Sequence, residues 1–240
     1  MGRLFRTALF AAKFVLLGAA CSPYPLCDPN SAEMQRVAPS SYVARFNTTA
    51  GVFSVGVNSS WAPHASSRFF NLARLGFYDG VYFFRVIDGF VNEFGLSGNP
   101  KLQASYCNDE ACPPGAEGLP PDGPIVAGGP SNVRGAIGFS LMDAHGNGAS
   151  VELFVNLANN SRLDSQGFVP FGLVTAVDMA VVDELYGGYG EMNQTDLCPD
   201  PTAKLCDGPK IQRIVSEGNA YLSRQFPRMS FVHAASIVQL

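Results

Sequence analysis

Apolar and polar residues alternate over short stretches of the chain, and turn-forming residues separate these stretches. Alternation with a period of two predicts β-strands, and eight such stretches follow residue 40. Two further segments have the apolar spacing of helices, and a third predicts a short extra helix near the C-terminus. We expect strands at residues 42–46, 51–57, 81–86, 90–94, 135–141, 152–156, 171–174 and 230–238, and helices at 66–75, 178–185 and 218–226. The pattern therefore predicts a mainly β protein.

The segments outside this pattern divide the chain into three parts. We interpret residues 1–20 as a signal peptide, 21–40 as a Pro- and Ser-rich leader with few core contacts, and 41–240 as one domain. With 240 residues, of which 47% are hydrophobic and 15% charged, the chain can bury one sizeable core. Within the domain, residues 99–130 form a long Pro- and Gly-rich excursion, which we expect to be an ordered loop on the functional face.

The N-terminus has the features of a secretory signal. Arg3 and Arg6 precede a largely apolar stretch that ends in small residues at Ala20, where we expect cleavage. One alternative is a membrane anchor, which the short stretch, interrupted by Lys13, disfavours. Another is a bacterial lipoprotein signal that ends at Cys21. We expect a protein of the secretory pathway or the extracellular space, without membrane association after signal removal.

The six cysteines support export, because disulfides persist in oxidising compartments. They fall in three close pairs, and local disulfides are the simplest interpretation. A zinc site is disfavoured, since the spacings are long and no histidine lies near any pair. The predicted disulfides are Cys107–Cys112 and Cys198–Cys206, and the pairing of Cys21 with Cys27 stays open. Glycosylation sequons occur at Asn47, Asn58, Asn159 and Asn193, so we expect a glycoprotein.

One arginine, Arg85, lies inside the almost wholly apolar run 83–90. Burying a guanidinium is costly unless it is paired or faces a group that needs a donor, so Arg85 is the leading catalytic candidate. The alternative is a strand-edge arginine whose head reaches water. The three histidines lack metal-ligand or acid–base spacing, and no nucleophile motif appears. We therefore expect no metal site.

Three segments resemble the cyclophilin-type peptidyl-prolyl isomerases, in the order and spacing of that family. Residues 83–90, with F-x-R-V-I-x-G-F, resemble its signature segment. Residues 61–80 are similar to its first helix and the following turn, and residues 135–174, with G-A-I, E-L-F-V-N and L-D-S-Q-G-F-V-P-F-G, to its second half. Together they cover about residues 43–190, and the C-terminal tail looks like that of a secreted subgroup.

The resemblance implies a closed, eight-stranded antiparallel barrel capped by two helices, with an extra C-terminal helix. It implies an isomerase of X-Pro bonds in which Arg85 donates to the proline nitrogen of the twisted transition state, without a cofactor. The partners would be proline-containing polypeptides. By position, the apolar proline site would consist of Phe90, Val91, Phe154 and Leu163, with Met142 nearby.

The sequence departs from the family at positions close to the arginine. Glu93 and Glu152 replace residues that are usually glutamine, and we expect both within reach of Arg85. A carboxylate could hold the guanidinium away from substrate, or orient it as a glutamine would and leave other donors free. Arg162 stands where many members carry tryptophan, which affects specificity. Two functions follow: an isomerase of weak to moderate activity on exported chains, or a proline-peptide binding module without turnover.

Net charge excludes two other classes of function. The chain carries a net charge of -4 and has no cluster of lysine and arginine beyond the N-terminus. It therefore lacks an electrostatic basis for binding nucleic acid or anionic membranes. We expect a monomer.

Overall fold

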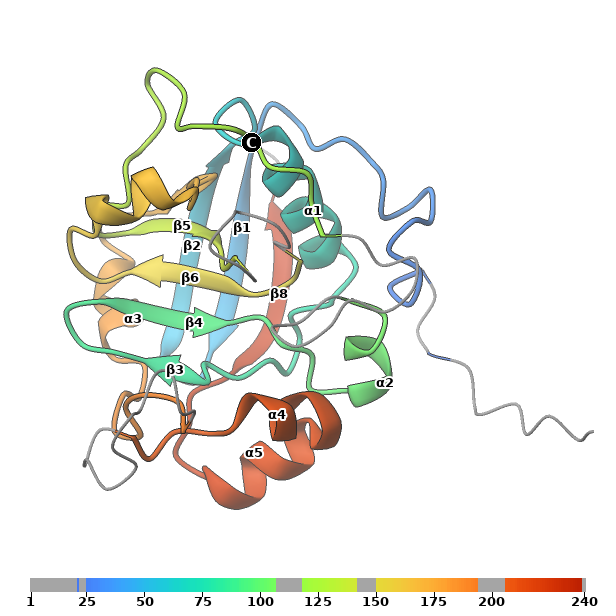
Figure 1. Cartoon of the computed structure of the whole chain (residues 1–240), viewed down its shortest axis with the longest axis vertical. Coiled ribbons are helices and arrows are strands. Elements are labelled where there is room, and N and C mark those ends of the chain that lie inside the picture. Colours follow the sequence, from blue (N-terminus) through green and yellow to red (C-terminus); the bar gives the residue numbers. More distant parts are fainter. Residues whose placement is uncertain (1–20, 22–24, 107–117, 142–149, 194–205, 239–240) are drawn as a thin grey trace, which may run out of the picture.

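The computed structural model describes residues 21, 25–106, 118–141, 150–193 and 206–238 (Figure 1). Within them, one sheet of eight strands curls around the core, in the order β3-β4-β6-β5-β7-β2-β1-β8. All its neighbouring strands are antiparallel. The strands are β1 (Ser41–Thr48), β2 (Gly51–Asn58), β3 (Arg85–Val86), β4 (Val91–Phe94), β5 (Ala136–Phe139), β6 (Leu153–Asn156), β7 (Gly172–Val174) and β8 (Val232–Val238). The prediction of a mainly β protein is confirmed.

The predicted closed barrel is wrong, because β3 and β8 form the two ends of an open, curled sheet. β3 has only two residues and is too short for a second ladder, so among the described strands it pairs only with β4. The two edges meet just before these strands begin. There, Tyr82 and Phe231 form an isolated bridge, and Phe83 N donates to Ser230 O at 2.9 Å.

In the described part of the chain, five α-helices and one 3-10 helix accompany the sheet (Figure 1): α1 (Pro63–Arg74), α2 (Pro100–Gln103), η1 (Ser161–Gln166), α3 (Met179–Asp183), α4 (Ile211–Glu217) and α5 (Asn219–Gln225). The expected helices correspond to α1, α3 and α5. α1 begins earlier than predicted, since proline suits the first helical position and Asp122 accepts hydrogen bonds from His64 N and Ala65 N. Among the described residues, none of these helices has the length and apolar character of a membrane span.

The extra C-terminal helix is in fact a pair, α4 and α5, with Gly218 between them. A side chain at Gly218, whose φ is +59°, would approach Gly98 O within 2.2 Å, so only glycine fits this junction. The two helices cover a second apolar cluster, to which Phe84 belongs, whereas the neighbouring Phe83 enters the main core. The segment that leads into β3 therefore connects the two cores.

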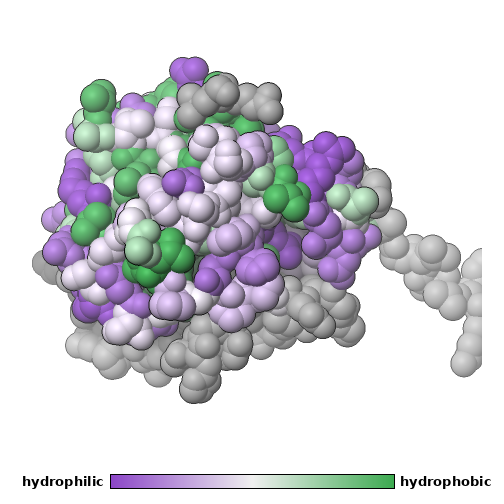
Figure 2. Space-filling model, turned by 90° about the horizontal axis from the view of Figure 1, so that it is seen from above, coloured by the Kyte–Doolittle hydropathy of each residue, from purple (hydrophilic) through white to green (hydrophobic). Residues whose placement is uncertain are grey.

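Aromatic side chains fill the main core between the sheet and α1. The ring centroids of Phe69 and Phe171 are 4.8 Å apart, and those of Phe83 and Phe94 are 4.7 Å apart. Because successive residues of a strand point to opposite faces, each strand that contributes to this core also presents residues to the outer face. On the face that Figure 2 shows, hydrophobic side chains are dispersed among hydrophilic and neutral ones.

The leader packs against the domain, contrary to the expected scarcity of core contacts. Leu26 and Met34 are each only 2% exposed and belong to the main core. Tyr106 Oη donates to Leu26 O at 2.6 Å. Apolar residues spaced within a Pro-rich segment thus extend the core although they form no regular element.

A disulfide joins Cys21 to Cys27, the pair that the sequence left open. Cys206 is disulfide-bonded too, as predicted, but Cys198 lies outside the described residues. The predicted pair Cys107–Cys112 also lies outside them, as do the predicted signal peptide at residues 1–20 and Met142.

Candidate active site

One row of paired residues crosses the outer face of the sheet. Arg85 of β3 pairs with Glu93 of β4, Glu93 pairs with Phe154 of β6, and Phe154 pairs with Gly138 of β5. Paired residues point to the same side of a sheet, and the next residues along these strands, such as Val86 and Leu153, enter the core. Strand alternation therefore brings the predicted catalytic arginine and a predicted pocket phenylalanine to one surface.

The predicted proline-site residues gather beside this row. Val91, Phe154 and Leu163 form a separate buried cluster, and Phe90 and Phe168 pack against it partly exposed. The rings of Phe154 and Phe168 meet edge to face with centroids 5.7 Å apart. We call this cluster, with its two flanking rings, the apolar hollow. Its role as the proline site stays a prediction.

Gly138 makes room for the floor of the hollow. A Cβ at this position would lie 3.2 Å from two ring carbons of Phe154. That distance is shorter than the 3.5–4.0 Å of an ordinary carbon contact. The glycine therefore permits the phenylalanine ring to lie flat over β5.

Arg85 lies at the edge of the hollow with its side chain only 10% exposed. Its Cζ is 5.3 Å from the centroid of the Phe90 ring, within the range of a cation–π contact. Nη1 donates to Glu93 Oε1 at 2.6 Å, while Nε and Nη2 donate to the two carboxylate oxygens of Glu191 at 2.5 and 2.7 Å. Burial alone would lower the pKa of Arg85, but these two carboxylates outweigh it and raise the pKa above its usual value.

Two N–H groups of Arg85 are not bonded to any residue that the structure describes. A guanidinium has five N–H groups, and three of them bond to the two glutamates. The other two have no partner among the residues that the structure describes. Arg85 is thus ion-paired through three of its five N–H groups.

One of the two carboxylate partners of Arg85 is not the one that we predicted. Glu93 pairs with Arg85 as predicted, but the second partner is Glu191, and no ion pair joins Arg85 to Glu152 within the described chain. Glu152 is buried, at 8% exposure, just before β6. Sequence reasoning missed Glu191, because it lies 106 residues after Arg85 in a polar segment whose position no pattern indicates.

A network of amide side chains fixes the hollow. Asn160 Nδ2 donates to Phe90 O and to Asn156 Oδ1, both at 2.8 Å. Asn156 Nδ2 in turn donates to Asn132 Oδ1 at 3.2 Å, and Asn132 donates from N and Nδ2 to Asp164 Oδ1. Because η1 lies within this network, Leu163 is held against Phe154.

Asp164 is the acceptor at the end of the network. Its other oxygen accepts a hydrogen bond from Ser131 Oγ. Partial burial would raise the pKa of Asp164, but the hydrogen bonds from Ser131 and Asn132 hold it below its usual value. The carboxylate is therefore the form that the fold requires.

Arg162, at the position that we associated with specificity, adds a second cation to the hollow. Its Cζ lies 4.8 Å from the Phe90 ring centroid, and Nη1 donates to Asn160 Oδ1 at 3.0 Å. The side chain belongs to an exposed residue of η1. Phe90 therefore contacts two guanidinium groups, those of Arg85 and Arg162.

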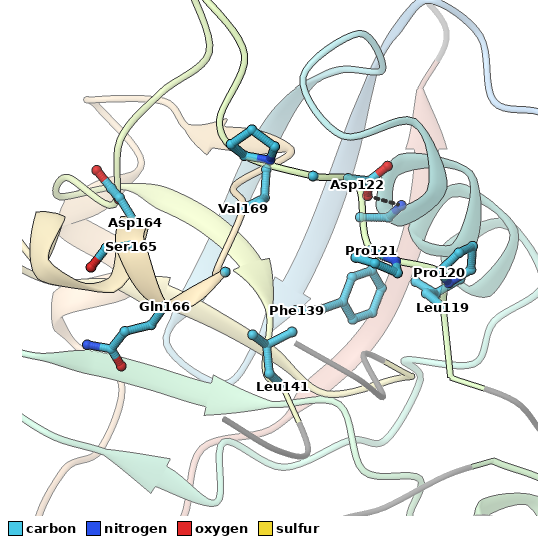
Figure 3. A pocket seen from close by; sticks show the side chains of 14 residues that line it. Leu119, Pro120, Pro121, Asp122, Phe139, Leu141, Asp164, Ser165, Gln166 and Val169 are labelled. Carbon is cyan, nitrogen blue, oxygen red and sulfur yellow. Dashed lines mark hydrogen bonds between the residues drawn. The ribbon is translucent and has the colours of Figure 1, made fainter. Parts of the chain in front are cut away.

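A cavity of about 470 Å³ lies on the other side of η1 (Figure 3). Figure 3 shows Asp164, Ser165 and Gln166 of η1 on one side, the segment with Pro120, Pro121 and Asp122 on the other, and Phe139 and Leu141 between them. η1 contributes Ser165 and Gln166 to this cavity and Leu163 to the hollow. The cavity offers mixed polar and apolar walls next to the candidate site, and the sequence did not predict it.

The fold and this site together define a class of protein. Its members have a curled antiparallel sheet that carries a donor arginine beside an apolar hollow. The family model described as "Cyclophilin type peptidyl-prolyl cis-trans isomerase/CLD" matches residues 43–204, more than half of the chain. The chain therefore belongs to the cyclophilin-type peptidyl-prolyl cis-trans isomerase family.

Individual relatives agree with this membership. The chain is 29% identical over 143 residues to peptidyl-prolyl cis-trans isomerase A of Dickeya dadantii, which covers 58% of this chain and 67% of the relative. It is 30% identical over 122 residues to peptidyl-prolyl cis-trans isomerase-like 2 of Emericella nidulans, covering 44% of this chain and 20% of that relative. A cyclophilin-type isomerase structure from Cryptosporidium parvum covers 83% of this chain and 99% of its own, with a TM-score of 0.52 and 14% identity, which supports the fold.

Proposed function

We propose that this protein isomerises X-Pro peptide bonds with Arg85 as an electrostatic catalyst. Rotation about such a bond meets a barrier of about 18–20 kcal/mol, because amide resonance must be broken. In the twisted transition state the proline nitrogen regains a lone pair, so a donor directed at it binds that state more tightly than either planar isomer. The reaction needs neither a covalent intermediate nor a cofactor.

The observation that carries the proposal is the position of Arg85 relative to the hollow. The proline ring would enter between Val91, Phe154 and Leu163, and the Phe90 ring, which contacts Arg85, would form its edge. The two N–H groups of Arg85 that have no partner among the described residues then supply the donor. An apolar surrounding strengthens this hydrogen bond, since competing water is displaced.

The two glutamates limit the rate of this enzyme. Opposite charges about 4 Å apart attract by roughly 4 kcal/mol at an effective dielectric of 20. A charge-assisted hydrogen bond to substrate contributes about 1.5–3 kcal/mol. Because Glu93 and Glu191 hold Arg85 more strongly than a substrate can, we infer weak to moderate activity.

The same ion pairs favour a second candidate function. A guanidinium that is neutralised twice over can stabilise a bound peptide by packing while contributing little to the rotation itself. The protein would then be a module that binds proline-containing polypeptides in the hollow without turnover. The enzyme remains our first proposal, because two N–H groups of Arg85 lack partners among the described residues.

We propose exported chains as the substrates. The signal-like sequence of residues 1–20 supports this proposal, as do the disulfides at Cys21–Cys27 and Cys206, which are typical of oxidising compartments. The sequons add weight, since they predict passage through a glycosylating pathway. The protein would act there on newly translocated polypeptides in the secretory pathway or outside the cell.

A proline-peptide isomerisation assay on wild type and Arg85→Ala tests the proposal. Loss of a charge-assisted hydrogen bond of about 1.5–3 kcal/mol predicts a fall in kcat/KM of about tenfold to about a hundredfold. Peptide binding, measured by calorimetry, should weaken much less. Equal rates for the two proteins would refute catalysis by Arg85, and a wild type that binds the peptide without accelerating exchange would establish the binding module instead.

A further inference from the structure

Glu191 occupies one whole edge of the Arg85 guanidinium. Its two carboxylate oxygens accept from Nε at 2.5 Å and from Nη2 at 2.7 Å, a bidentate geometry that fixes both the position and the plane of the group. The side chain of Glu191 is only 17% exposed. Glu93 contributes one hydrogen bond from the opposite side. Glu191 is therefore the principal partner of the proposed catalytic donor.

The main chain on either side of Glu191 is fixed by the segment around Cys206. Glu191 O accepts from Gly208 N at 3.0 Å, and Asn193 N donates to Pro209 O at 3.2 Å. Gly190 and Cys206 form an isolated antiparallel bridge. A side chain at Gly208 would come within 2.5 Å of Glu191 O, so the contact depends on glycine.

This segment leads directly into the C-terminal helices. Met192, the neighbour of Glu191, is 4% exposed and packs in the second apolar cluster with Ile211 and Ile214 of α4 and Tyr221 of α5. Met192 N also donates to Glu191 Oε1 at 2.9 Å. The family match ends at residue 204, so α4 and α5 lie beyond it. Glu191 itself lies within the matched region, and the helices that follow this region pack against its neighbour Met192.

We propose that Glu191 is a positioning residue that restrains the isomerase, so that the C-terminal helical region sets the strength of the donor at Arg85. This proposal rests on the proposed catalytic role of Arg85. One positive and two negative charges leave the Arg85–Glu93–Glu191 group net negative, which opposes the accumulation of electron density on the proline nitrogen. The bidentate contact also keeps the guanidinium from approaching the substrate.

Glu191→Gln is the direct test, because glutamine keeps the shape and one acceptor but removes the charge. We expect kcat to rise by about fivefold or more, with KM little changed, because a negative charge beside the reacting nitrogen is removed. The matched control is Glu217→Gln, which removes a carboxylate paired with Arg213 and Arg224 on α4 and α5. It should leave kcat as in wild type. A purely structural role for Glu191 would lower the melting temperature without raising kcat.

Gly208→Ala tests the tether independently, since its added methyl group displaces the backbone of Glu191. Gly208→Ala should also raise kcat. In the Glu191→Gln background it should raise kcat no further, because both changes release the same contact. An unchanged or lower kcat for Glu191→Gln, in a protein whose activity still depends on Arg85, would overturn the inference. Equal activity of wild type and Arg85→Ala would instead refute the proposed function itself.

Discussion

Gly138→Ala places a methyl group under the floor of the apolar hollow. The new Cβ would lie 3.2 Å from Cε1 and Cζ of Phe154 and 3.4 Å from Val169 O. The ring must move by a few tenths of an ångström, since ordinary carbon contacts lie at about 3.5–4.0 Å. Because the added Cβ lies on the Gly138 side of the ring, we expect the ring to move away from β5 and into the hollow.

The size of this effect follows from overpacking. Added methyl groups in packed sites cost about 1–3 kcal/mol, and the small displacement here places Gly138→Ala near 1 kcal/mol. If this strain is relieved by narrowing the hollow, KM for a proline peptide should rise about fivefold, because 1.36 kcal/mol corresponds to a factor of ten. The turnover number should change less, since Arg85 lies three strands away in the row.

The assay is steady-state isomerisation of a short X-Pro peptide, with thermal unfolding measured on the same samples. Gly56→Ala is the matched control, because its Cβ would meet only Leu173 O at 3.8 Å. Gly56→Ala should leave KM unchanged and should have little effect on stability. A Gly138→Ala protein that is destabilised but retains the wild-type KM would refute the assignment of the hollow as the proline site.

Two further predictions concern the supports of the site and of the fold. Because the pKa of Asp164 is lowered in the folded protein, its carboxylate stabilises the fold above the unfolded pKa of about 4, and this contribution is lost as pH falls through the folded pKa. The stability difference between wild type and Asp164→Asn, measured by urea unfolding, should therefore be larger at pH 7 than at pH 3. An equal difference at the two pH values would contradict the role of the carboxylate. Reduction of the Cys21–Cys27 disulfide, or Cys27→Ser, should cost about 2 kcal/mol of stability for so short a loop. Calorimetry that finds no loss of stability would show that the leader is held without the disulfide, by contacts such as those of Leu26 and Met34.

The sequence predicted the strands well, because alternation is a local property. Arg85, Glu93 and Phe154 could also be placed on one surface, since strand register and the family spacing act together. The open edge could not be foreseen in this way. It depends on β3 having only two paired residues, which reflects how Phe83 and Phe84 are divided between two cores.

The two carboxylate partners of Arg85 show the limit of prediction from sequence patterns. Glu93 is the cross-strand neighbour of Arg85, so its contact follows from register, whereas Glu191 reaches Arg85 through tertiary contacts at Gly208 and Met192. No local pattern encodes such contacts. The α4 helix is a different case, because apolar residues at Ile211, Ile214 and Val215 have helical spacing that sequence reasoning overlooked.

Catalysis by Arg85 is the central claim, and magnetisation exchange between the cis and trans signals of an X-Pro peptide tests it most directly. The experiment reports the exchange rate and, through shifts of the peptide signals, binding in the same sample. Wild type should accelerate exchange that otherwise takes tens to hundreds of seconds, and Arg85→Ala should bind the peptide while exchange returns close to the uncatalysed rate. Equal acceleration by both proteins would contradict the account.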